Sequence, residues 1–442
     1  MSNYMGIEPV KPEDRNMTGF DAALLWIGAA IGLGEIFAGS YVAGLGFGIG
    51  IVALFVGKII GGLPMYATSL IGSREGIPGM VSTRPSFGVL GSYFPSVLNA
   101  LQLIGWTAVM VVLGGQACQV VAESLGIFDN FFFWTALIGV LCTINAILGH
   151  NFWKWFQRFA VAITVIVSLV MTIVVFQHYS FSELLAMPAP GGISFIVAVD
   201  IVIAMSLSWV PLVADYSRYG KNPKRTAHGM YWGYWIASLW MQFVGFLVAT
   251  ATGMASADPI ALMTGLGLGI IAVMVILFST ITTAFLDIFS TGVAAKNFLP
   301  MIKERTLVFW GGIIGTAVAL FFPIIVNYQN FLLIIGAVFV PLEAIVIVDY
   351  FLIRKKVQFD ALFEKKGLYW YTGGFNIVAY VALIVGFIIY QVAYYGWWPT
   401  GSSIPSFIIT GVLYYIIAKV AMPSHFAGSR KDSATGSQNI SA

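Results

Sequence analysis

Hydroxyl side chains gather within one apolar stretch of the second half, which reads ILFSTITTAFLDIFSTG. Ser279, Thr282 and Thr283 are three or four positions apart, so a helix places them on one face. Hydroxyl oxygens and a free backbone carbonyl form an oxygen cage that suits a hard monovalent cation. The alternative is that each hydroxyl bonds back to its own helix. We favour the cation site because five polar groups fall within nine residues, namely Ser279, Thr280, Thr282, Thr283 and Asp287.

Two other apolar stretches contain helix-breaking residues near their middle. The first stretch, IGAAIGLGEIFAG, contains Gly28, Gly32, Gly34 and Glu35. The sixth, AMSLSWVPLVADYSRYG, contains Ser206, Ser208, Trp209 and Pro211. An interrupted helix leaves amides and carbonyls free to bind a polar solute or a cation. The alternative is that the glycines only allow close helix packing. The matched positions of the two interruptions favour the binding site.

A third stretch, LQLIGWTAVM, carries Gln102 and Trp106 one helical turn apart. An indole can stack on a flat ring while an amide bonds the edge of that ring. A tryptophan that only packs against other helices or anchors the chain at the interface is the alternative.

Charged residues within apolar stretches are costly and usually face the protein interior. We expect Glu35 to face the substrate, with Asp287 as the next candidate. Asp200, near the outer end of the sixth stretch, is a candidate gate or structural partner. Lys58 is a candidate partner for one of these acids, in a structural or a functional role.

The elements that position these residues are expected to be membrane-spanning helices. The chain of 442 residues is 59% apolar and 9% charged, with a mean hydropathy of +0.89, which excludes an ordinary soluble domain. Crossing a bilayer takes about 20 apolar residues, and backbone groups in lipid must be paired within each segment. The expected spans are Phe20–Leu45, Gly48–Ile71, Pro95–Leu125, Phe131–Leu148, Phe156–Gln177, Phe195–Tyr219, Met230–Thr252, Pro259–Ala295, Leu307–Val326, Phe331–Leu352, Asn376–Tyr394 and Pro405–Val420.

The positive charges predict how these spans are oriented. Of the 22 Lys and Arg residues, 21 fall in the two ends of the chain and in the even-numbered gaps between spans. Positive charge is retained on the cytoplasmic face. The pattern therefore predicts twelve crossings of the cell (inner, cytoplasmic) membrane, with the N- and C-termini in the cytoplasm.

The order of the spans predicts two repeats. We expect a cytoplasmic tail at 1–19, five-helix repeats at 20–177 and 195–352, two additional helices at 376–420 and a disordered cytoplasmic tail at 421–442. An odd number of helices in each repeat inverts the second repeat in the membrane.

Several function classes find no support. HExxH, GxSxG and phosphate-binding loop motifs are absent, so an enzyme or an ATP-driven pump is not indicated. Most spans lack the polar lining that a channel needs. The net charge of +3 reflects topology rather than nucleic-acid binding. Cys118 and Cys142 lie in apolar stretches, where we expect small core residues and no disulfide. No segment indicates an oligomeric state.

Motifs spread over nearly the whole chain resemble nucleobase–cation symporter family 1, the purine/cytosine permease family. They are EGIPGMVSTRPSFGVLGS, IGWTAVM, WVPLVADYSRYGKNP and VPLEAIVIVDYFLIRKK. Within the family, GEIFAG, NALQLIGWTAVM and TTAFLD are most similar to hydroxymethylpyrimidine permeases of the CytX type, and less similar to cytosine permeases of the CodB type.

The resemblance implies an all-α, LeuT-like five-plus-five inverted repeat with two extra C-terminal helices and a sodium site between the first and eighth helices. The implied sodium ligands are the carbonyls of Gly28, Ile31 and Ser279 and the hydroxyls of Thr282 and Thr283. The substrate ring would stack on Trp106. The edge of the ring would meet Gly32, Glu35, Gln102, Ser206 and Ser208, and the expected substrate-binding set also includes Gly34, Trp209 and Asp287.

Three departures from the cytosine and hydantoin members bear on the substrate. Those members carry Asn after the hydroxyl pair, where this chain has Ala284 and then, three residues on, Asp287. Gln102 lies four residues before Trp106, where cytosine permeases have it three before, and Glu35 replaces a neutral residue. A carboxylate accepts hydrogen bonds from a ring amino group and from a protonated ring nitrogen, which favours an aminopyrimidine.

The sequence therefore predicts a secondary transporter that imports a pyrimidine, hydroxymethylpyrimidine or a related aminopyrimidine, by symport with Na⁺ and alternating access. The alternatives are cytosine or another nucleobase as substrate, and proton coupling through Glu35 or Asp287. No cofactor other than the coupling ion is expected.

Overall fold

The computed structural model of the chain describes residues 6–148, 150–257, 259–265, 269–321, 327–396, 398–423 and 425, with the backbone alone at 150–160, 263–265 and 269–279. The described residues are helical apart from loops and two isolated β-bridges. Ser279 and all of the predicted disordered tail beyond 425 lie outside the residues whose side chains are described.

The helices follow the apolar stretches of the sequence. They are α1 Gly19–Ala30, α2 Leu33–Val42, α3 Phe47–Glu75, α4 Arg84–Phe87, α5 Tyr93–Leu125, α6 Phe131–Leu148, α7 His150–His178, α8 Phe181–Ala186, α9 Phe195–Ser217, α10 Pro223–Thr252, α11 Pro259–Gly265, α12 Gly269–Lys296, α13 Glu304–Phe321, α14 Tyr328–Val348, α15 Ile377–Tyr395 and α16 Ser403–Ala421. A π-helix, Asp349–Arg354, extends α14.

Eleven of the expected spans have a counterpart in this order. Within the described residues, ten helices are long and apolar enough to cross a membrane, and α1 with α2 forms one further, bent span. The expected eighth span, Pro259–Ala295, is divided between α11 and α12, and the residues between these two helices lie outside the described ones. A twelfth crossing therefore stays a prediction.

The first span is interrupted where the glycines predict it. α1 ends at Ala30, α2 begins at Leu33, and the two helices meet at a bend of 62°. Gly32 is extended, with φ −141° and ψ 157°, and its amide donates to the Ala30 carbonyl at 2.9 Å. An uninterrupted helix would direct this amide to the carbonyl of Gly28. The Gly28 carbonyl therefore loses its usual donor.

The predicted interruption of the sixth span is wrong. α9 runs without a break from Phe195 to Ser217 and contains Pro211. The hydroxyls of Ser206 and Ser208 donate to the carbonyls of Val202 at 3.2 Å and Met205 at 2.7 Å in the same helix. Serine hydroxyls that bond back to their own helix satisfy themselves without unwinding it.

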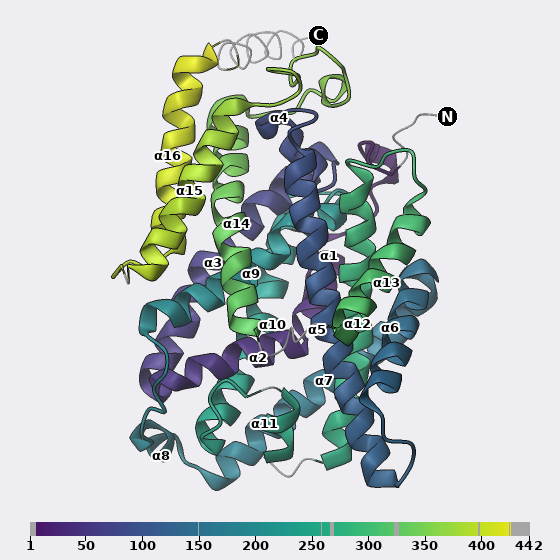
Figure 1. Ribbon diagram of the computed structural model, residues 1–442, viewed down its shortest axis with the longest axis vertical. Coiled ribbons are helices and arrows are strands. Elements are labelled where there is room, and N and C mark those ends of the chain that lie inside the picture. Colours follow the sequence, from purple (N-terminus) through teal and green to yellow (C-terminus); the bar gives the residue numbers. More distant parts are fainter. Residues whose placement is uncertain are drawn as a thin grey trace.

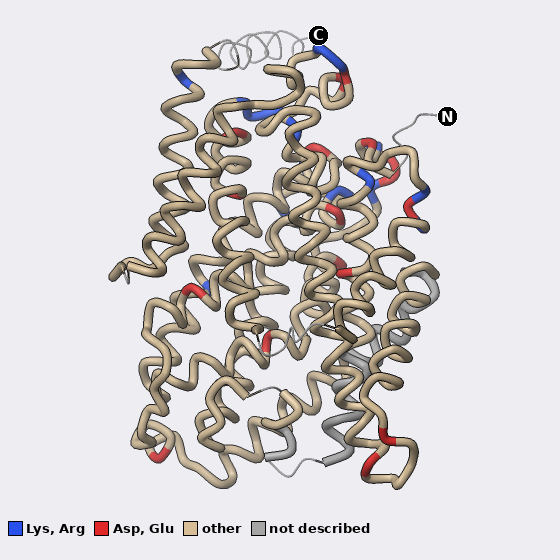
Figure 2. Tube along the Cα trace, in the orientation of Figure 1, with Lys and Arg blue, Asp and Glu red and all other residues tan. Residues whose placement is uncertain are grey.

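The first and last described parts of the chain and most positive charges lie at the same end of the molecule. α15 and α16 lie together along one edge beside α14, and α6 and α13 lie at the opposite edge (Figure 1). Lys and Arg gather at the end of the molecule where the described part of the chain begins and finishes (Figure 2). This is the distribution that the alternating gaps of the sequence predict.

Glycines allow α2 to touch α10. A Cβ at Gly39 would lie 2.0 Å from the carbonyl oxygen of Gln242, and a Cβ at Gly245 would lie 1.9 Å from the carbonyl oxygen of Ile36. Neither backbone oxygen can move aside cheaply, so the contact requires glycine on both helices. This contact brings Gln242 against the helix that carries Glu35.

A second pair of glycines seats α3 against α9. A Cβ at Gly57 would lie 2.6 Å from Val202 Cβ, and a Cβ at Gly61 would lie 2.9 Å from Ile203 Cα. Lys58 lies between these two glycines in the sequence. The close approach therefore places its side chain in the interface between α3 and α9.

Candidate transport site

The interruption of the first span lies against α12. A Cβ at Gly32 would lie 3.2 Å from the hydroxyl oxygen of Thr283. Thr282 and Thr283 are both buried, and the Thr283 hydroxyl has no hydrogen-bond partner among the described residues. Gly28, one turn earlier, approaches α7, where a Cβ would lie 3.3 Å from Val161 Cγ2. A hydroxyl oxygen beside a helix break, with no described hydrogen-bond partner, is the kind of ligand that hard cations prefer.

Trp106 of α5 is buried with 6% of its surface exposed, so it does not face lipid. A Cβ at Gly34 would lie 3.0 Å from Cζ3 of this indole. The rings of Tyr328 and Phe331 meet the indole edge-on, with centroids 5.9 and 5.3 Å away. The Tyr328 hydroxyl also donates to the Gly34 carbonyl at 2.7 Å. The first turn of α14 thus holds the indole against α2.

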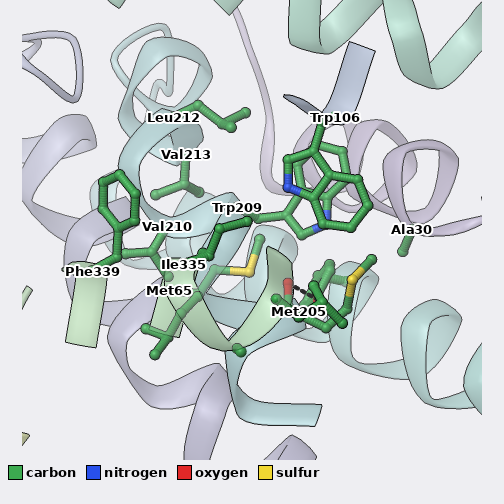
Figure 3. Close-up of a cluster of buried hydrophobic side chains, with 14 of the residues drawn as sticks. Ala30, Met65, Trp106, Met205, Trp209, Val210, Leu212, Val213, Ile335 and Phe339 are labelled. Carbon is green, nitrogen blue, oxygen red and sulfur yellow. Dashed lines mark hydrogen bonds between the residues drawn. The ribbon is translucent and has the colours of Figure 1, made fainter. Parts of the chain in front are cut away.

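Trp209 belongs to the same buried cluster (Figure 3). Its ring packs edge-on against Trp26 of α1, with centroids 5.6 Å apart. Within the described part of the chain, the indole N–H groups of Trp106 and Trp209 have no acceptor. Each therefore offers a donor to a ligand with acceptor atoms on its edge.

Gln102 connects α5 to α9. Its Nε2 donates to Asn99 Oδ1 and to the Ser208 carbonyl, both at 2.9 Å. Both amide hydrogens are therefore used, whereas Gln102 Oε1 has no donor among the described groups. The amide consequently presents an acceptor alone.

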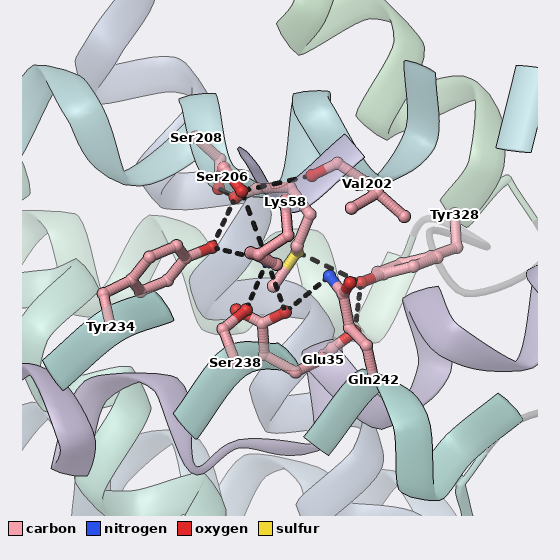
Figure 4. Close-up of polar contacts among 11 residues, drawn as sticks. Glu35, Lys58, Val202, Ser206, Ser208, Tyr234, Ser238, Gln242 and Tyr328 are labelled. Carbon is pink, nitrogen blue, oxygen red and sulfur yellow. Dashed lines mark hydrogen bonds and ion pairs between the residues drawn. The ribbon is translucent and has the colours of Figure 1, made fainter. Parts of the chain in front are cut away.

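Glu35, in the first turn of α2, is 1% exposed. Gln242 of α10 donates its Nε2 to Glu35 Oε2 at 2.8 Å (Figure 4). The other oxygen, Oε1, has no hydrogen-bond donor in the described structure. A buried carboxylate with one satisfied and one unsatisfied oxygen can accept a further N–H or O–H.

Lys58 is fully buried and lies 3.9 Å from Glu35 Oε2. Its Nζ donates to Ser238 at 2.5 Å, to Ser206 at 3.2 Å and to the Tyr234 hydroxyl at 3.5 Å. These contacts join α2, α3, α9 and α10 in one buried polar cluster (Figure 4). The pairing of Lys58 with an acid, one of the alternatives from the sequence, is confirmed.

The other two candidate acids, Asp200 and Asp287, have different surroundings. Asp200 accepts from the amides of Ser402 at 2.8 Å and Ser403 at 3.0 Å, so it caps the N-terminus of α16. Of the two alternatives for Asp200, the structure supports the structural partner. Asp287 of α12 is buried, and its Oδ2 has no partner among the described residues.

The structure brings several predicted residues into contact and separates others. Gly32 meets Thr283, Gly34 meets Trp106, and Gln102 meets the backbone of Ser208. The Ser206 hydroxyl contacts Lys58, the ion-pair partner of Glu35, whereas Asp287 has no described contact with the other predicted residues through its Oδ2.

Four residues of the site were not predicted from the sequence: Tyr234, Ser238, Gln242 and Tyr328. A lone amide in the apolar run MQFVGFLVAT was the signal for Gln242.

A multi-pass helical fold with one interrupted span beside a buried polar site is the arrangement found in membrane transporters. The chain belongs to the family of permeases for cytosine/purines, uracil, thiamine and allantoin, which matches residues 9–413. This family is nucleobase–cation symporter family 1, as the resemblance indicated. The protein is therefore a secondary transporter of nucleobase-like substrates.

Individual relatives agree with this assignment, and a solved structure matches the fold. The chain is 27% identical to the hydantoin permease of Microbacterium maritypicum, over 86% of this chain and 83% of that protein. It is 25% identical to the cytosine permease of Escherichia coli K12, over 90% and 87%. The fold matches that of Mhp1, a nucleobase-cation-symport-1 transporter in a closed conformation with bromovinylhydantoin bound, with a TM-score of 0.81 at 22% identity over 94% and 96% of the two chains.

Proposed function

We propose that the protein imports an aminopyrimidine, hydroxymethylpyrimidine or a close relative, together with Na⁺, and that it is of the CytX type within its family. The observation that carries the substrate class is the carboxylate of Glu35, whose Oε1 has no described donor. Its neighbour Gly34 packs on Trp106. A ring stacked on this indole would direct an exocyclic amino group, a hydrogen-bond donor, toward an acceptor.

Gln102 supports the same substrate class. Its Oε1, which has no described donor, is a second acceptor, and the Trp209 N–H, which has no acceptor among the described residues, is a donor. An aminopyrimidine carries both amino hydrogens and ring nitrogens that accept. Cytosine and other nucleobases share part of this pattern and are the alternative substrates.

Na⁺ is the proposed coupling ion. The Gly28 carbonyl has lost its helical donor, and the Thr283 hydroxyl next to the break has no described partner. We assign the ion to the carbonyls of Gly28, Ile31 and Ser279 and the hydroxyls of Thr282 and Thr283. Proton coupling through Glu35 or Asp287 is the alternative. Each of these residues has a carboxyl oxygen without a partner among the described residues, so each could carry a proton.

We further propose twelve crossings of the cytoplasmic membrane, arranged as two inverted five-helix repeats and two extra helices. Both termini would lie in the cytoplasm, because Lys and Arg gather at the end that carries them. The bent first span would shift with its neighbours to open the site to either side in turn.

Uptake into proteoliposomes tests the substrate and the ion together. Hydroxymethylpyrimidine, cytosine and hydantoin would be compared with and without a Na⁺ gradient at fixed pH. We expect Na⁺-dependent uptake of the aminopyrimidine and no uptake by the Glu35→Gln variant. Normal uptake by that variant would remove Glu35 from the site, and uptake driven by a pH gradient alone would replace Na⁺ with protons.

A further inference from the structure

We infer that the site takes its substrate as a neutral molecule, and that Lys58 is the positioning residue that sets this preference by neutralising Glu35. The inference rests on the proposed function, because it concerns the charge of the ring that Glu35 meets. It also narrows the sequence-based expectation, in which Glu35 could accept from a protonated, cationic ring nitrogen.

Lys58 has the contacts of a satisfied ammonium group. An ammonium has three N–H donors, and three hydroxyl oxygens surround Nζ, on Ser206, Ser238 and Tyr234. Nζ also lies 4.9 Å from the centre of the Tyr234 ring, on the electron-rich face that attracts a cation. The cluster is therefore built to hold a positive charge.

Glu35 is the counter-charge of that ammonium. The Nζ to Oε2 distance is 3.9 Å, and both side chains are buried, at 0% and 1% exposed. Among the described residues, no other acid or base forms an ion pair with either group. Asp200 of α9, the helix that carries Ser206, instead accepts hydrogen bonds from the amides of Ser402 and Ser403. The cluster as a whole is thus neutral.

Binding a charged substrate beside a neutral cluster is unfavourable, because the cluster has no spare counter-charge for it. Moving an ion out of water into a protein interior is costly unless a partner of opposite sign repays the loss. Glu35 already serves as the counter-charge that offsets this cost for Lys58. What Glu35 has left is the lone pair of Oε1, which suits a neutral N–H or O–H donor such as a ring amino group.

The test compares two rings of the same shape. One carries a methyl group on a ring nitrogen and is a permanent cation. The other is a neutral analogue in which carbon replaces that ring nitrogen, so that the methyl group lies at the same position. Binding of each is measured by ligand-induced change in melting temperature and by competition with hydroxymethylpyrimidine, at one pH. Because the two rings match in shape, their ratio of dissociation constants reports charge.

The wild type is expected to bind the neutral ring at least about tenfold more tightly than the cation. Lys58→Met leaves Glu35 unneutralised, so it should lower this ratio by about tenfold or reverse it. Lys58→Arg keeps the charge and should keep the preference.

Three outcomes would overturn the inference: equal binding of the two rings by the wild type, an unchanged ratio in Lys58→Met, or a lost preference in Lys58→Arg. If Lys58→Met does not fold, the wild-type ratio and Lys58→Arg still decide. A wild type that binds neither ring nor hydroxymethylpyrimidine would instead defeat the proposed function, which is a distinguishable result.

Discussion

Gly34 lies directly against the indole of Trp106, so closely that a Cβ at this position would come within 3.0 Å of the ring. The contact joins the first turn of α2 to α5 immediately beside the break in the first span. Glu35 follows in the sequence and enters the polar cluster with Lys58. The proposed stacking surface and the proposed acceptor are therefore positioned by two consecutive residues.

Gly34→Ala should weaken substrate binding by about tenfold, because the added methyl group presses on the indole and overpacking a tight contact costs about 1–3 kcal/mol. The dissociation constant for hydroxymethylpyrimidine measures the effect. Gly48→Ala is the control, since its Cβ would meet only the mobile end of Leu185, at 3.3 Å. Equal affinity in Gly34→Ala and the wild type would separate this contact from the site.

Thr283→Ala should raise the Na⁺ concentration needed for half-maximal uptake by at least about tenfold, since the variant removes one ligand oxygen of the proposed ion site. Thr291→Ala is the matched control. Its hydroxyl donates to the carbonyl of Asp287 at 2.8 Å in the same helix, so it is not available to an ion. An unchanged Na⁺ dependence in Thr283→Ala would exclude that hydroxyl from the ion site.

Asp200→Ala should lower stability and leave substrate preference as it is. The carboxylate caps α16 through the amides of Ser402 and Ser403, and loss of such a cap costs about 1 kcal/mol. The melting temperature of the purified protein measures the loss, with the exposed Asp129→Ala as control. A variant with normal stability and altered substrate affinity would show instead that Asp200 acts as a gate.

The contact between His425 and Arg354 should weaken in acid. Burial, followed by the positive charge of Arg354, lowers the pKa of His425 from 6.5 to about 4. A detached His425 binds a proton more readily between these values, so the contact is fully formed above pH 6.5 and is lost progressively as pH falls toward 4. A spin label at position 423 should become more mobile over that range. A spin-label mobility that does not change with pH, or that changes equally in His425→Gln, would contradict this prediction.

The sequence by itself determined the features that depend on local composition. Apolar length and the retention of positive charge are properties of each segment in turn, so eleven of the expected spans coincide with described helices. The break at Gly32 was equally predictable, because three glycines within seven residues remove side-chain support from one turn of the helix.

Only the tertiary structure decided which polar groups satisfy one another. Ser206 and Ser208 bond back to their own helix, so the sixth span stays continuous although its composition suggested a break. The cluster of Glu35, Lys58 and Gln242 depends on close approach of helices that are distant in the chain, and glycines such as Gly39 and Gly61 permit that approach. A buried charge can take any partner of suitable chemistry, and packing selects one among them.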